Sequence, residues 1–153
     1  MVNNPSSIKL RAHHLLCMRG FKGYGYSKDF VNNLRSIIDQ LTAHPTTEIE
    51  IIDECDAICA HCPHKKNDRC AADKNAWQRI KERDHKVLQA LTLGVGTKIN
   101  MIDLTILIEE KLNTPEVVQD ICGNCIWKDI CLNQTNSSTI KCFANFFRNL
   151  FKE

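Results

Sequence analysis

Two short cysteine groups constrain most strongly how this 153-residue chain can fold. Six of the nine cysteines follow a C-x2-C-xn-C plan within residues 58–70 and 121–131: Cys59, Cys62 and Cys70, then Cys122, Cys125 and Cys131. A C-x2-C turn can direct two thiolates toward one metal ion. The fold must therefore hold two polar loops in place and bring further ligands to them.

Composition limits the class of protein. A length of 153 residues with 43% apolar content suits a single domain over residues 1–153 with a buried core. The net charge of +2 and the pI near 8.1 fall short of the strongly basic balance of a nucleic-acid binder. The longest apolar run, MIDLTILI, is too short to span a bilayer, and the N-terminus resembles no signal peptide.

These features predict a cytoplasmic chain, and that location bears on the cysteines. Reducing compartments disfavour structural disulfides, and nine cysteines cannot all pair within one chain. Ligation of a metal ion or cluster is therefore the leading interpretation of the two groups.

Hydrophobic periodicity and capping residues predict a mainly α fold with a minor, short β element: a small, cysteine-rich α+β domain built around one or two metal or cluster sites. The expected elements are a short helix over residues 8–20, a helix over 28–43 capped by Ser27, a strand over 47–52, a helix over 76–91, a helix starting after Asn100, a helix starting at Pro115 after Thr114, and an amphipathic final helix over 143–151.

Each cysteine group supplies three ligands, whereas a structural zinc ion or a cubane cluster takes four. HHLLC offers Cys17, with His13 and His14 as further candidates, because His13 and Cys17 share a helical face. The helix over 28–43 and the strand over 47–52 form an out-and-back path toward the first group, so Cys17 is expected to complete Cys59, Cys62 and Cys70. The second group would then keep a fourth position for a histidine, Cys142, solvent or substrate.

Four segments, in order, resemble a known prokaryotic family: LRAHHLLCMRGFKGYGYSKDFVNNL, DAICAHCP with Cys70, RDHKVL, and ICGNCIWKDIC. The family is domain of unknown function 1284, and the resemblance implies binding of an iron-sulfur cluster. The family's motif positions correspond here to Cys17, Cys59, Cys62, Cys70, Cys122, Cys125 and Cys131, and its histidine pair to His13 and His14. Ala12 replaces the expected proline, and Cys55 and Cys142 stand outside the pattern.

The expected function is therefore that of an iron-sulfur protein with one or two clusters, of the four-iron, four-sulfur type. It would serve electron transfer or a cluster-dependent step, with a redox protein as partner. Pro63 after Cys62 is typical of ferredoxin loops, and Lys65, Lys66 and Arg69 would offset the negative charge of a thiolate centre.

Three alternatives compete with this interpretation. The same cysteines suit structural zinc sites in an interaction module. Cys17 could instead be a nucleophile activated by His13 or His14. Cys55 creates the C-x3-C-x2-C spacing of radical S-adenosylmethionine enzymes, but a short helical chain cannot supply their barrel of alternating strands and helices.

Overall fold

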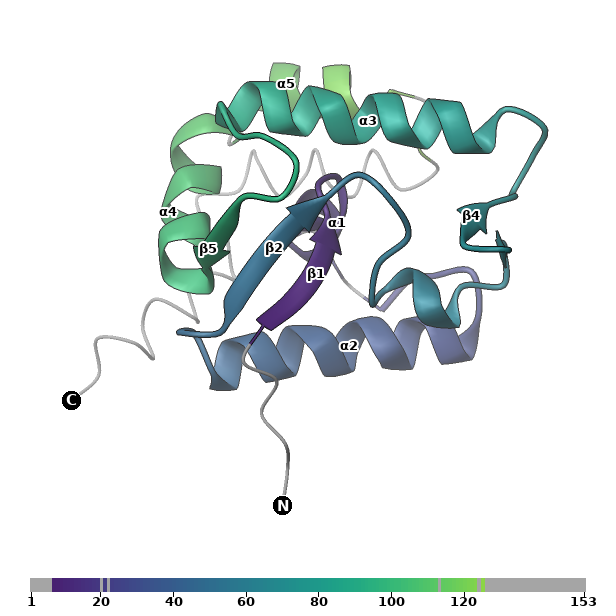
Figure 1. The fold of residues 1–153 in the computed structure, drawn as a ribbon, viewed down its shortest axis with the longest axis horizontal. Helices are drawn as coiled ribbons and strands as arrows, with labels where there is room; N and C mark the ends of the chain where they lie inside the picture. The colour runs from purple at the N-terminus through teal and green to yellow at the C-terminus, as the bar shows by residue number, and fades with distance from the viewer. Residues whose placement is uncertain (1–6, 20, 22, 113, 124, 126–153) are drawn as a thin grey trace.

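A three-stranded sheet lies between the long helices of the domain (Figure 1). The computed structural model describes residues 7–19, 21, 23–112, 114–123 and 125. Strand β2 (Glu48–Ile52) is central, with β1 (Ser7–Arg11) parallel on one side and β5 (Lys98–Asn100) antiparallel on the other. Ile49 and Ile51 of β2 are fully buried, as expected for the central strand of a sheet covered by helices.

Strand β1 corrects the predicted helix over residues 8–20. The segment divides into β1 and a short helix, α1 (His14–Arg19). Leu10 and Arg11 at the end of the strand are buried, while the backbone pairs with β2 from Ser7 to Arg11. The partner strand lies about forty residues further along the chain, so local periodicity in the sequence did not reveal the pairing.

The predicted long helices are confirmed. They are α2 (Lys28–Ala43), α3 (Ala76–Leu91), α4 (Met101–Lys111) and α5 (Pro115–Cys122). The side chains of Ser27, Asn100 and Thr114 accept hydrogen bonds from main-chain N–H groups in the first turns of α2, α4 and α5. In Figure 1, α2 and α3 lie on opposite sides of the strands.

Helix α4 is buried on one face only. Leu104 and Ile108 are buried, but Ile106 is 42% exposed. The helix packs on β5 and α3 and leaves its other face to solvent. The predicted helix over 143–151, and Cys131 and Cys142, lie outside the described residues.

The first cysteine group occupies the connection between β2 and α3. A single 3-10 turn, η1 (Cys59–His61), is followed by a two-stranded hairpin of β3 (Lys65–Lys66) and β4 (Arg69–Cys70). The described chain is thus an α+β fold with mainly helical structure and short strands, as the sequence predicted. This connection places the first cysteine loop beside Arg11, the last residue of β1.

Candidate metal centre

Four thiols line one cavity of about 50 Å³ beside the end of β1. They belong to Cys55, Cys59, Cys62 and Cys70, all from the connection between β2 and α3. The N-terminal segment adds Arg11, His13 and His14 to the lining, and the loop before α2 adds Tyr26. The remaining lining residues are Phe30, Lys65 and Ile80. Sulfur and imidazole donors therefore meet in one small space.

The backbone of the cysteine loop positions three of these thiols. The N–H of Cys62 donates to the carbonyl of Cys59 at 2.9 Å, and the N–H of Lys65 donates to the carbonyl of Cys62 at 3.2 Å. The hairpin then reverses through Asn67 and Asp68, whose φ angles of 50° and 61° are those of a tight two-residue turn. As a result, Cys70 pairs with Lys65 in the hairpin and returns to the Cys62 turn.

The second cysteine pair has the same local geometry. The N–H of Cys125 donates to the carbonyl of Cys122 at 2.8 Å, at the end of α5. Both C-x2-C segments therefore form the compact turn that the spacing predicted. Cys122 is buried and Cys125 is partly exposed.

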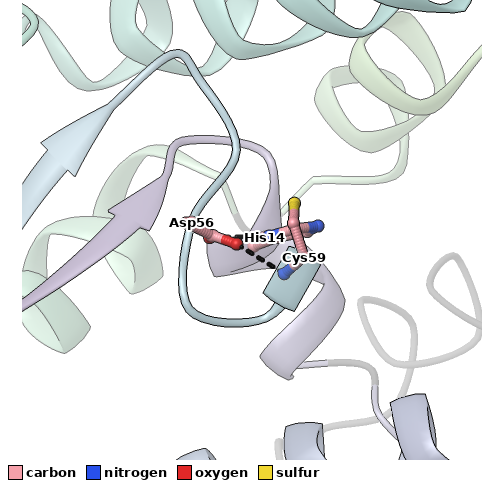
Figure 2. A group of neighbouring side chains, drawn as sticks. All are labelled: His14, Asp56 and Cys59. Atoms are coloured by element: carbon pink, nitrogen blue, oxygen red, sulfur yellow. Dashed lines mark hydrogen bonds and ion pairs between the residues drawn. The ribbon is translucent and has the colours of Figure 1, made fainter. Parts of the chain in front are cut away.

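Asp56 ties the cysteine loop to the histidine segment (Figure 2). One carboxylate oxygen accepts the main-chain N–H groups of Ile58 and Cys59, each at 3.0 Å. The other accepts the N–H of Arg11 at 2.7 Å and lies 2.8 Å from Nδ1 of His14. Burial alone would raise the pKa of Asp56, but the charge and hydrogen bond of His14 and the main-chain donors hold it well below its usual range.

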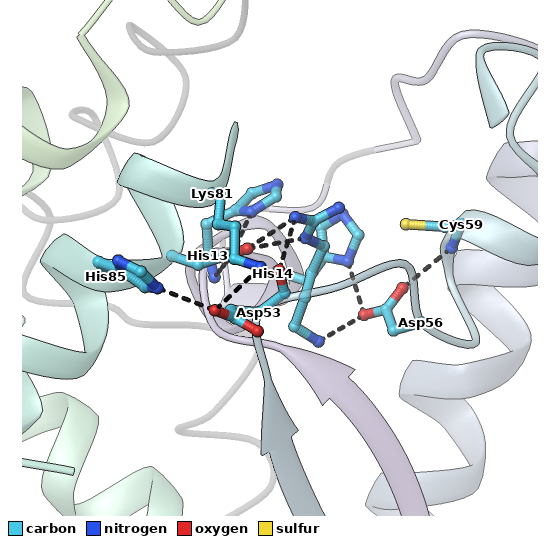
Figure 3. Close-up of polar contacts among 9 residues, drawn as sticks. His13, His14, Asp53, Asp56, Cys59, Lys81 and His85 are labelled. Atoms are coloured by element: carbon cyan, nitrogen blue, oxygen red, sulfur yellow. Dashed lines mark hydrogen bonds and ion pairs between the residues drawn. The ribbon is translucent and has the colours of Figure 1, made fainter. Parts of the chain in front are cut away.

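Asp84, on α3, makes the equivalent connection to His13. Figure 3 shows His13 and His14 among these polar contacts. Its Oδ1 accepts the N–H of His13 at 2.9 Å and lies 2.7 Å from Nδ1 of that ring. Its Oδ2 accepts Nε and a terminal nitrogen of Arg11 at 3.0 and 2.7 Å. Asp84 is fully buried and Arg11 is 1% exposed, so two charges are removed from water together.

Both histidines consequently use Nδ1 for a carboxylate. No hydrogen bond to Nε2 of either ring is formed within the part of the chain that the structure describes. Burial and the neighbouring charge of His14 lower the pKa of His13 to about 4, so its ring is neutral near pH 7. A neutral imidazole that donates from Nδ1 keeps a lone pair on Nε2, the form that binds metal ions.

The thiols of Cys55 and of the first group (Cys59, Cys62 and Cys70) lie close together. Those of Cys55 and Cys59 are within hydrogen-bonding reach, and Cys70 influences the pKa values of both Cys55 and Cys62. Burial raises the pKa of Cys59 well above its usual range, and the charge of Asp56 adds to that effect. A buried thiol of this kind is a poor nucleophile, but a metal ion deprotonates it on binding.

The sequence predicts that Cys17 completes the first group. This residue lies on α1 and is not among the described residues that line the cavity. Partial burial raises the pKa of Tyr26 to about 12. The negative charge of four cysteines adds to the increase, with the largest contribution from Cys125 and smaller ones from Cys17, Cys62 and Cys70. Thiols of both cysteine groups therefore act on the charge of this tyrosine, and the membership of Cys17 in the first set stays a prediction.

Asp56 and Asp84 were missed in the sequence analysis, although a signal was present. Asp84 falls on the apolar stripe of α3, four residues before Leu88 and three before Val87, both buried. An acidic residue on a core-facing stripe indicates a buried partner. Asp56 had a weaker signal, its position three residues before Cys59.

Comparisons with known proteins identify one family. The model of a family described as "Protein of unknown function (DUF1284)" matches residues 25–131. No curated protein and no solved structure matches the chain. The match starts after His13, His14 and Cys17 and includes Cys55 and both C-x2-C pairs. Among the described helices, none has the length and apolar character needed to cross a membrane.

Proposed function

The chain belongs to the DUF1284 family of unknown function, and we propose that it is a metal-thiolate protein whose centre is an iron-sulfur cluster. The cluster would be held at the cavity by Cys59, Cys62 and Cys70 and would serve electron transfer or a cluster-dependent step. The observation that carries the proposal is the convergence of these thiols, with Cys55, on one cavity that also contains two histidines.

Nearby positive charge supports a thiolate centre. Arg11 and Lys65 line the same cavity as Cys59, and the charge of Arg11 lowers the pKa of the Cys59 thiol against the effect of burial. A cluster or metal ion with several thiolate ligands carries net negative charge, which such cations stabilise.

The position of the thiols supports exchange of electrons with a partner. Cys55, Cys62 and Cys70 are partly exposed, whereas Cys59 is buried. A centre held by Cys59, Cys62 and Cys70 would lie near the surface, within reach of a redox protein. Reduced thiols persist in the cytoplasm, which we propose as the location.

Structural zinc is the second candidate, and two observations favour it. The first is size, because a cavity of about 50 Å³ suits a single ion. The second is the pairing of each histidine: a zinc-binding histidine commonly donates the N–H of its other ring nitrogen to a carboxylate, and Nδ1 of both His13 and His14 lies against an aspartate here. In that case the centre would stabilise the fold, and the function would lie on the surface of the domain.

Purification without oxygen distinguishes the two candidates. The iron-sulfur proposal predicts a coloured protein that contains iron and acid-labile sulfide and whose visible absorption bleaches on reduction. A colourless protein with stoichiometric zinc would overturn it in favour of the second candidate. Cys62→Ser should lower the iron and sulfide content, because it removes a thiol that lines the cavity.

A further inference from the structure

We propose that His14 is a ligand of this centre through Nε2 and that Asp56 positions it, so that three thiolates and one imidazole hold the metal. The three thiolates are those of Cys59, Cys62 and Cys70. This inference rests on the proposed metal centre and assigns the fourth ligand, for which the sequence offered Cys17, with His13 and His14 as further candidates.

Distance and burial bring His14 and Cys59 together. Donor atoms of His14, Asp56 and Cys59 lie within 4.8 Å of one another, and all three residues are buried. Two ligands on one tetrahedral ion, at about 2.0 Å for nitrogen and 2.3 Å for sulfur, are separated by roughly 3.5 Å. The two side chains are therefore close enough for a ring nitrogen of His14 and the sulfur of Cys59 to reach one ion after side-chain rotation.

Asp56 belongs to this group as a positioning residue, not as a ligand. Each of its oxygens already has two partners: the N–H groups of Ile58 and Cys59 on one, and Arg11 and His14 on the other. Binding a metal through Asp56 would break contacts that hold the cysteine loop and the histidine in place. Through these contacts, one carboxylate orients the His14 ring and fixes the backbone of Cys59 (Figure 2).

The orientation of the ring determines the donor atom. Because Nδ1 of His14 lies 2.8 Å from Asp56, Nε2 is on the opposite side of the ring, and the residue lines the cavity. This is the carboxylate-histidine-metal arrangement, in which the carboxylate fixes the tautomer and strengthens the ligand. His13 has a similar pairing with Asp84, but it is not part of the compact donor group that His14 forms with Cys59.

Replacing one thiolate by a neutral imidazole has a functional consequence. A centre with three thiolates and one imidazole carries one less negative charge than a centre with four thiolates. Histidine ligation raises the reduction potential of an iron-sulfur cluster for this reason. We therefore expect a higher potential than that of the same centre with a fourth cysteine.

Isotopic labelling tests the ligand without changing the chain. The full-length protein is purified without oxygen from cells supplied with ¹⁵N-histidine, and pulsed electron paramagnetic resonance is recorded on the reduced cluster. X-ray absorption at the metal edge applies if the metal is zinc. The expected result is one directly bound histidine nitrogen and three sulfur ligands from protein. A centre with four cysteine sulfurs and no bound nitrogen would overturn the assignment of His14.

Variants identify which histidine and which thiol are involved. His14→Cys should keep the metal, lose the nitrogen signal and lower the potential, whereas Cys55→Ser should change none of these. Asp56→Asn should weaken metal binding by about 10- to 100-fold. Asp84→Asn, the matched change at His13, should weaken metal binding by the folded protein less than Asp56→Asn does.

Two outcomes separate the inference from the proposed function. Loss of metal in Cys55→Ser with an unchanged centre in His14→Cys would make Cys55 the fourth ligand and overturn this inference alone. A wild-type protein that binds neither iron, sulfide nor zinc would overturn the proposed function, and this inference with it.

Discussion

Removal of the carboxylate of Asp84 should destabilise the domain severely. Asp84 is fully buried and accepts four hydrogen bonds, two from Arg11 and two from His13. In Asp84→Ala the guanidinium of Arg11, itself 1% exposed, becomes a buried charge without its carboxylate. Breaking a buried ion pair from one side costs about 3–5 kcal/mol. This is a large part of the roughly 5–15 kcal/mol by which a domain is stable.

Urea denaturation measures this effect. With a slope of about 2 kcal/mol per molar urea, a loss of about 4 kcal/mol lowers the unfolding midpoint by about 2 M. Asp84→Asn keeps the shape of the side chain and part of its hydrogen bonding, so its urea unfolding midpoint should lie between those of the wild type and Asp84→Ala. The Asn variant remains measurable if the Ala variant does not fold.

The chain contains a matched control for this experiment. Asp73 binds Arg79 through two hydrogen bonds of 3.0 and 2.7 Å, the same chemistry as Asp84 with Arg11, but both of these side chains are exposed. Water screens an exposed pair, so Asp73→Ala should leave the urea midpoint almost unchanged. Equal midpoints for Asp73→Ala and Asp84→Ala would refute the argument that burial makes the Asp84 interaction strong.

Three further perturbations test other parts of the structure. Lowering the pH from 6.5 to 4 should reduce the free energy of unfolding by up to about 3 kcal/mol, because the buried ring of His13 binds a proton in this range only after unfolding. Urea midpoints measured across this range should show the loss in the wild type, and His13→Gln should remove the pH dependence that His13 causes. Asn33→Ala removes donors to two carbonyls of the cysteine loop, at 2.9 and 3.4 Å, and should speed metal loss to a chelator; an unchanged rate would exclude this anchoring role. Gly25→Ala places a methyl group 2.6 Å from Phe30 and should cost about 1–3 kcal/mol in thermal unfolding, whereas Gly94→Ala meets no atom within 4 Å and should be tolerated.

Local sequence determined the helices and the form of the cysteine turns. Ser27 and Asn100 start helices because their side chains satisfy N–H groups only three residues away, so a short segment contains all the information. The C-x2-C spacing likewise determines a turn closed by its own backbone, as at Cys59 and Cys62. These features depend on interactions between neighbours in the chain and are predictable for that reason.

Tertiary structure decided the nature of β1 and the composition of the candidate site. Ile8 to Arg11 becomes a strand only because β2 provides a partner for its backbone. Arg11 and His13 meet Asp84 across more than seventy residues, and His14 meets Asp56 across forty-two. Residue spacing carries no direct information about such distant pairs. The folded chain pairs them because a buried charge or imidazole is stable only beside a group that compensates for the loss of water.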